Sequence, residues 1–113
     1  MKPPIRPDDD VYQTLLLAGI PGTRMAYQEG DAPPLPWFVY KSRRGGEVIA
    51  DDRNWSKMHR YSAELYMREY DPELVERFED AIGSIGPYVA HDETWVPTER
   101  CLMVSYDFTY HAE

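Results

Sequence analysis

Side chains of the types that bind metals are densest at residues 91–93, where a histidine is followed by an aspartate and a glutamate. If this stretch is a strand, neighbouring side chains point to opposite faces, so only His91 and Glu93 could share a metal. A further ligand would have to come from elsewhere in the chain, because metal sites need more than two protein ligands. The pattern therefore favours a solvated turn or a strand end over a metal site.

Cys101 is the only cysteine, and it stands at the start of an alternating strand pattern with no catalytic motif beside it. A buried structural thiol is the favoured interpretation, rather than a nucleophile paired with a distant histidine. The glycine pair Gly45-Gly46 lacks the Lys-Ser/Thr of a phosphate-binding loop. We therefore predict that the protein is not an enzyme and has no catalytic, cofactor-binding or metal-binding residues.

The 113 residues carry 20 acidic and 12 basic side chains, a net charge of −8. This balance argues against a protein that holds nucleic-acid phosphates, because that affinity comes from clustered Lys and Arg. The length and even composition predict one domain over residues 1–113. One cysteine, no long apolar run and no signal-peptide pattern predict a protein made in the cytosol.

A strand that leads into a helix is predicted between residues 60 and 85. The residues expected on the buried face of the strand are Tyr61, Ala63, Leu65 and Met67. The residues expected on the buried side of the helix are Leu74, Val75, Phe78, Ala81, Ile82 and Ile85. Asp71 can cap this helix and Pro72 fits its first position. Gly83 and Gly86 both offer a left-handed end, and Pro87 prevents continuation.

Shorter elements are predicted on either side. Residues 1–7 form a proline-rich extended arm, Asp8 caps a helix that reaches Ala18, and Gly19 closes it. Strands are expected at 23–27, 37–40, 48–50, 88–96 and 101–110, with the run at 37–40 central in the sheet. Together these elements predict a two-layer α+β domain, with one largely antiparallel β-sheet and two α-helices packed on one face.

In order and spacing, the sequence resembles the small tail-terminator, or tail-completion, proteins of long-tailed bacteriophages. The matching pieces are YQE at 27–29, LPWFVY at 35–40, ADDRNW at 50–55, YSAELYMREYDPELVERFEDAI at 61–82 and VPTERCLMVSYDF at 96–108. The resemblance covers nearly the whole chain after residue 10. The Pro-rich arm and the Arg43-Arg44-Gly-Gly segment depart from the pattern.

This resemblance implies a structural virion protein that assembles as a homo-oligomeric ring, usually a hexamer, at the head-proximal end of the tail tube. The ring would stop tube polymerisation and form the head-joining surface. Its partners would be other copies of itself, the major tail-tube protein and a head-completion or connector protein, while DNA passes through without specific binding. Assembly would take place in the host cytoplasm, with no membrane involved.

The candidate interface residues are Arg43, Arg44, Arg53, Trp55 and Trp95. Arg43 and Arg44 are adjacent cations beside a glycine turn in an acidic chain, so we expect them to contact opposite charges on a neighbour. The alternatives are a head-tail connector or head-closure protein, a small ligand-binding α+β domain outside phages, and an enzyme that uses His91 and nearby acids.

Overall fold

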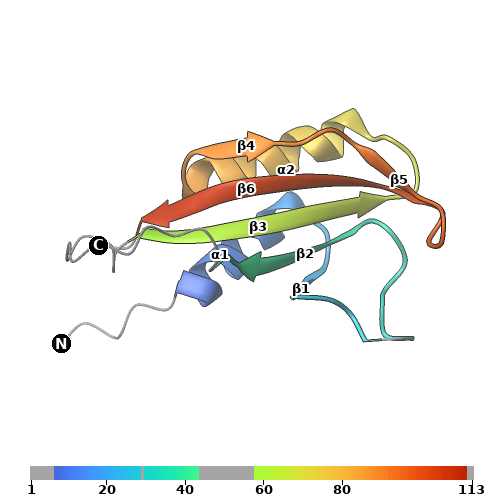
Figure 1. Ribbon diagram of the computed structural model, residues 1–113, viewed down its shortest axis with the longest axis horizontal. Coiled ribbons are helices and arrows are strands. Elements are labelled where there is room, and N and C mark those ends of the chain that lie inside the picture. The colour runs from blue at the N-terminus through green and yellow to red at the C-terminus, as the bar shows by residue number, and fades with distance from the viewer. Residues whose placement is uncertain (1–6, 29, 44–57, 112–113) are drawn as a thin grey trace.

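The computed structural model describes residues 7–28, 30–43 and 58–111 (Figure 1). The elements along the chain are α1 (Pro7–Leu15), the 3-10 turn η1 (Leu16–Ala18), β1 (Gly22–Arg24), β2 (Trp37–Ser42), β3 (Met58–Met67), α2 (Pro72–Ile85), β4 (Tyr88–Ala90), β5 (Thr94–Val96) and β6 (Cys101–His111). The predicted glycine turn at Gly45-Gly46, the predicted strand at 48–50 and residues 1–6 of the predicted arm lie outside the described residues. Among the described residues, no helix combines the length and apolarity needed to cross a membrane.

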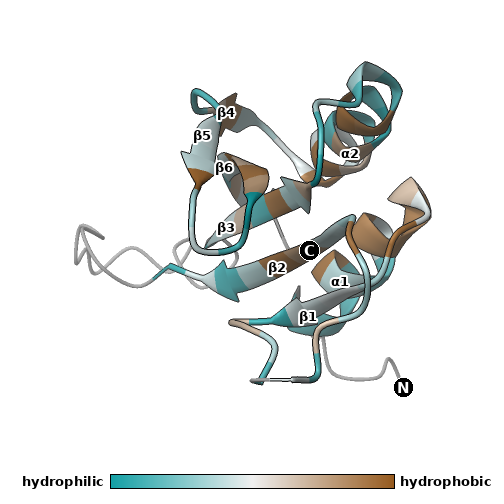
Figure 2. Ribbon diagram, turned by 90° about the vertical axis from the view of Figure 1, so that its right-hand side faces the viewer, coloured by the Kyte–Doolittle hydropathy of each residue, from teal (hydrophilic) through white to brown (hydrophobic). Residues whose placement is uncertain are grey.

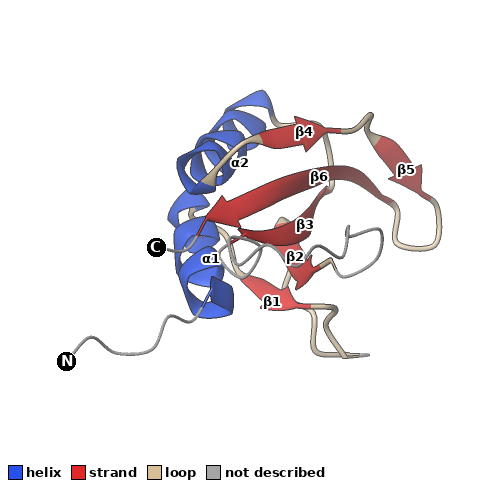
Figure 3. Cartoon of the chain, turned by 60° about the vertical axis from the view of Figure 1, so that its left-hand side comes forward, coloured by secondary structure: helices blue, strands red, loops and turns tan. Residues whose placement is uncertain are grey.

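The strands of the described residues form one mixed sheet in the order β1-β2-β3-β6-β4, and β5 also pairs with β6. Only the β1–β2 pair among them is parallel; the other pairs are antiparallel. Both helices lie on one side of the sheet, as Figure 3 shows. The predicted two-layer α+β architecture is confirmed.

The two longest strands, β3 and β6, occupy the centre of the sheet and pair along ten residues of β3. Alternate β3 residues are buried: Tyr61, Ala63, Leu65 and Met67. This confirms the predicted period-two pattern of β3, and β6 repeats it with Val104, Tyr106 and Phe108 buried. The run at 37–40 lies inside the sheet, because β2 is flanked by β1 and β3, and its consecutive residues Phe38, Val39 and Tyr40 are buried, as predicted for a strand covered on both faces.

Helix α2 starts and packs as its sequence predicts. The Asp71 carboxylate accepts a hydrogen bond from the Leu74 amide at 3.2 Å, and Pro72 occupies the first turn. The predicted apolar stripe faces the sheet, with Leu74, Phe78, Ala81 and Ile82 buried and Val75 and Ile85 partly buried. The predicted left-handed end is wrong: Gly86 has φ 169°, which is extended backbone, and Gly83 lies inside the helix.

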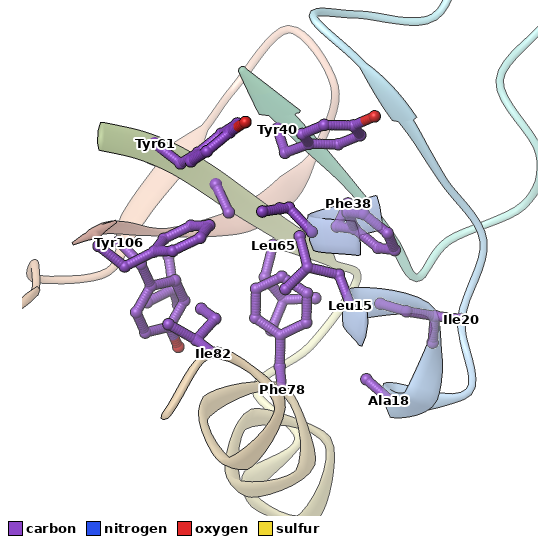
Figure 4. Packing of buried hydrophobic residues seen from close by; sticks show 14 of the residues in the cluster. Leu15, Ala18, Ile20, Phe38, Tyr40, Tyr61, Leu65, Phe78, Ile82 and Tyr106 are labelled. Atoms are coloured by element: carbon purple, nitrogen blue, oxygen red, sulfur yellow. The ribbon is translucent and has the colours of Figure 1, made fainter. Parts of the chain in front are cut away.

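The core lies between the helices and the sheet (Figure 4). In Figure 4 the Phe78 ring projects from α2 toward Leu65 and Leu15. Its ring centroid lies 5.5 Å from that of Phe38 and 5.6 Å from that of Tyr106. Such tilted aromatic contacts are favourable beyond the area that they bury. These contacts join α2 to β2 and to β6.

Tyrosine hydroxyls tie both helices to the sheet. Tyr61 of β3 donates to Asp8 of α1 at 2.6 Å, and Tyr106 of β6 donates to Glu79 of α2 at 2.9 Å. The Arg24 guanidinium also pairs with Asp8, at 3.1 Å. Asp8 is therefore inside α1 and bonds to the sheet, rather than preceding and capping the helix as predicted. At the other end, Gly19 has φ 88° and closes η1, as predicted.

These tyrosines predict a steep loss of stability in alkali. Burial raises the pKa of Tyr61 and of Tyr106 above the ordinary value of 10, and the bonds to Asp8 and Glu79 raise them further. Below pH 10 both tyrosines are protonated in the folded and in the unfolded chain, so their contribution to folding stability is fully present. Above it the unfolded chain ionises first, and folding should lose about 1.4 kcal/mol per pH unit for each tyrosine.

The measurement is urea unfolding at about pH 9, 10 and 11. We expect the variant Tyr61→Phe/Tyr106→Phe to be less stable at pH 9 but to lose clearly less stability with rising pH than the unmodified chain. If both proteins lost the same stability with rising pH, the loss could not be assigned to ionisation of Tyr61 and Tyr106.

Two of the short strands differ from their predictions. Strand β1 ends at Arg24 rather than at residue 27, because Met25 has a left-handed φ of 69° that ends the extended run. The predicted strand at 88–96 is two strands, β4 and β5, separated by an irregular link at residues 91–93. Both pair with β6, at different positions along it.

Candidate functional site

The face of the sheet opposite the helices carries the alternate residues of its three longest strands. Register and alternation place on this face Trp37, Val39 and Lys41 of β2, Ser62, Glu64 and Tyr66 of β3, and Met103, Ser105 and Asp107 of β6. The face has an aromatic end and a polar end, and Figure 2 shows the change along β2, which turns hydrophilic at its arrowhead.

The aromatic end is a cluster of three rings in tilted and edge-to-face contact. Trp37 lies with its ring centroid 4.5 Å from Tyr66 and 5.1 Å from Tyr27. The Tyr66 hydroxyl donates to Glu64 at 2.9 Å. Burial raises the pKa of Tyr66, and the bond to Glu64 raises it further, so this hydroxyl stays protonated. This aromatic cluster is an apolar surface rather than a reactive one.

The polar end is centred on Asp107. Its carboxylate contacts His91 Nε2 at 2.9 Å and Arg43 Nε at 3.8 Å. These three residues, with Lys41 and Ser105 among others, line a depression of about 650 Å³. All three side chains are about a third to a half exposed, so the ion pairs contribute little to stability.

A histidine bonded to a carboxylate supplies two members of a catalytic triad, and the third member is a nucleophile. Ser62 and Ser105 line the same depression. Within the described part of the chain, the hydrogen bonds of the His91 side chain go to Asp107 and not to a serine. The geometry gives His91 an orienting partner without a hydroxyl for it to activate.

The group at residues 91–93 does not form a metal centre with the rest of the described chain. These residues lie in the link between β4 and β5, and the His91 ring turns to Asp107. No group of three or more His, Cys, Asp and Glu side chains in residues 7–28, 30–43 and 58–111 is placed to hold a metal ion.

Cys101 is fully buried at the start of β6. Burial raises the pKa of its thiol and Glu99 raises it further, against a smaller lowering by Arg68. The thiolate is the nucleophilic form, so this environment makes the sulfur unreactive at neutral pH. The structure agrees with the prediction of a buried thiol.

A second depression, of about 630 Å³, lies where the β3–α2 link meets β5. It is lined by Arg68, Glu69 and Tyr70 of the link, Trp95 of β5, Arg100 of the turn before β6, and Leu102. Trp95 and Tyr70 are 52% and 54% exposed, which is high for aromatic side chains. The depression therefore combines two exposed aromatic side chains with two cationic ones.

In the part of the chain that the structure describes, the sheet ends in two different edges, which Figure 1 shows on opposite sides of the molecule. One edge is β1, followed by the exposed side chain of Met25. The other is made by β4 and β5 beside β6, and all of β4 is exposed, with Val89 60% accessible. Unpaired strand edges are ready-made surfaces for pairing with another chain.

The two candidate interface residues that the structure describes, Arg43 and Trp95, do not come together. Arg43 lies at the polar depression and Trp95 at the aromatic one. Arg44, Arg53 and Trp55 lie outside the described residues. Sequence reasoning missed Asp107 as the partner of Arg43, and Arg68 and Arg100 as the neighbours of Trp95. The only signal in the sequence was the alternation of β6, which places Asp107 on the exposed face. The contacts themselves join segments that are distant in the sequence.

Comparison of the chain with protein-family models found no match, and a search of curated proteins found none either.

Proposed function

We propose that this protein is a non-enzymatic structural component of a long-tailed bacteriophage, a tail terminator that forms a ring on the head-proximal end of the tail tube. The ring stops tube polymerisation and offers the surface that joins the head. The sequence resemblance across residues 27–108 suggests this role, and the two unlike edges of the sheet are the structural observation that supports it most directly.

A closed ring needs a heterologous interface, in which two different patches of each subunit meet. The β4–β5 edge of one copy and the β1 edge of the next are such a pair. Val89 on one edge and Met25 on the other are exposed apolar side chains that this contact would bury. Backbone pairing between edges would supply the hydrogen bonds, as in other β-strand additions.

The charge of the chain is compatible with a ring through which DNA passes. Each subunit carries a net charge of −8. Like charges repel the phosphate backbone, so DNA would move through without being held. The role we propose for the ring is therefore mechanical, with contacts to protein rather than to DNA.

The edge contact predicts the phenotype of a single substitution. In a phage whose own gene is deleted and complemented from a plasmid, Val89→Asp should fold normally by circular dichroism but yield overlong tails that lack heads. A carboxylate at the centre of the edge contact would be buried without a partner, which disrupts an interface.

The matched control is Leu17→Asp, which adds the same charge at an apolar side chain that is 76% exposed on the helical layer. We expect normal tails from it. Normal tail length and infectivity with Val89→Asp would reject the edge contact, and normal tails from the gene deletion would reject the terminator role itself.

Two other functions make different predictions in the same deletion. A head-closure or connector protein would leave tails of normal length that fail to join heads. The 650 Å³ polar depression favours a small ligand-binding domain as the further candidate. Ligand sites are mostly apolar and enclosed, whereas this depression is lined largely by charged and hydroxyl side chains, so we prefer the structural role.

A further inference from the structure

The depression beside Trp95 has the composition of a protein docking site. Trp, Tyr and Arg are the residues that most often dominate binding energy at protein interfaces, and this depression contains all three types. Trp95 and Tyr70 present large rigid apolar surfaces at low conformational entropy cost. Leu102 supplies further apolar surface, and the two guanidinium groups come from Arg68 and Arg100.

Arg100 is held in a backbone conformation that arginine rarely adopts. Its φ is 53°, in the left-handed region that favours glycine or asparagine, and its amide donates to the Pro97 carbonyl at 3.3 Å. Strained residues of this kind concentrate at functional sites, where the surrounding structure fixes them. Here the turn that carries the strain also places Arg100 at the depression.

The charge of the depression differs from that of the chain. Two arginines and one glutamate, Glu69, line it, while the whole chain has a net charge of −8. Neither Arg68 nor Arg100 forms an ion pair with another residue in the described part of the chain. Charge complementarity therefore favours an occupant that carries carboxylates. These carboxylates should be grouped in one segment of the occupant, because the acidic remainder of this surface repels them.

We propose that this depression docks an acidic segment of another protein, with carboxylates on Arg68 and Arg100 and an aromatic or aliphatic side chain between Trp95 and Tyr70. The inference goes beyond the terminator proposal and does not depend on it. The depression lies beside β5, which supplies Trp95 and whose place in the molecule Figure 1 shows. Its side chains are distinct from Val89 and Met25 of the two edges.

The test is selection from a random dodecapeptide library by mRNA display on the full chain. We expect the selected peptides to be enriched in Asp and Glu around one aromatic or aliphatic residue. Their affinity, measured by fluorescence anisotropy, should fall at least about tenfold with Arg68→Glu/Arg100→Glu and with Trp95→Ala. The control Lys41→Glu/Arg43→Glu makes the same charge change at the other depression and should leave the affinity unchanged.

The proposal is overturned if the selected peptides are not acidic, or if they bind Arg68→Glu/Arg100→Glu as well as the unmodified chain. If the charge-reversed protein fails to fold by circular dichroism, Arg68→Gln/Arg100→Gln replaces it with the same expected loss. Two further results would also overturn it. If the unmodified chain self-associates in sedimentation experiments and the charge-reversed variant does not, the depression binds a second copy of the chain. If the unmodified chain binds oligo(dT) and this variant does not, the depression binds nucleic acid.

Discussion

Replacing Phe78 with alanine is expected to lower the free energy of unfolding by about 3–5 kcal/mol. The side chain is fully buried, and its ring lies against Phe38 of β2 and Tyr106 of β6. Truncation removes the apolar area and leaves a cavity that the rigid neighbouring rings cannot fill. Because Phe78 joins α2 to two strands, the variant should melt at a lower urea concentration as a whole.

Glu76→Ala is the control, since Glu76 is two residues away on the exposed side of α2. It should change the stability by no more than about 0.5 kcal/mol. Urea unfolding followed by circular dichroism measures both variants. Equal and small effects of the two substitutions would show that α2 does not pack through the face described.

Alanine at two glycines three residues apart should give effects of opposite sign. Gly86 follows α2, and a Cβ placed there would overlap the backbone carbonyl oxygen of Thr109 in β6. Backbone cannot turn aside as a side chain can, so Gly86→Ala must push α2 away from the sheet. We expect a loss of about 1–3 kcal/mol.

Gly83→Ala is the matched substitution inside the helix. The nearest atom to its added Cβ is in the Tyr88 ring at 3.7 Å, an ordinary contact distance. Alanine is about 1 kcal/mol better than glycine in a helix interior, so stability should rise. Thermal unfolding of both variants tests the pair. A stabilised Gly86→Ala protein would mean that α2 does not approach β6 so closely.

Elements set by local chemistry were predictable from the sequence. The period-two patterns of β3 and β6 and the 3.6-residue stripe of α2 determine which residues are buried, because the buried face must be apolar along its length. Asp71 fixes the start of α2 because its side chain accepts a hydrogen bond from the Leu74 amide, and Pro72 fits the first helical position. The layer arrangement followed from these elements.

Features set by distant contacts were not predictable in the same way. Pro87 limits where α2 can end, but nothing beside Gly86 in the sequence records its extended backbone or its closeness to Thr109 of β6. The break between β4 and β5 falls where His91 turns to Asp107. The parallel β1–β2 pair was not predicted either.

The candidate site shows the same division. Trp95 could be proposed as an interface residue from its type alone. The presence of Arg68 and Arg100 beside it depends on where the β3–α2 link meets the turn before β6. That meeting is a property of the folded chain. The same holds for the contacts of Asp107 with Arg43 and His91, which come from three separate segments.

The central position of β6 has a consequence for how the protein folds as it is synthesised. Strand β6 pairs with β3, β4 and β5, which all precede it in the sequence. A chain still on the ribosome can form the backbone hydrogen bonds of α2, which are local, but its sheet lacks the middle strand until residues 101–111 have emerged. Closure of the long loop between β3 and β6 then becomes the slow step. Chains that stop before Cys101 therefore lack the centre of the sheet rather than an edge, and we expect them not to fold.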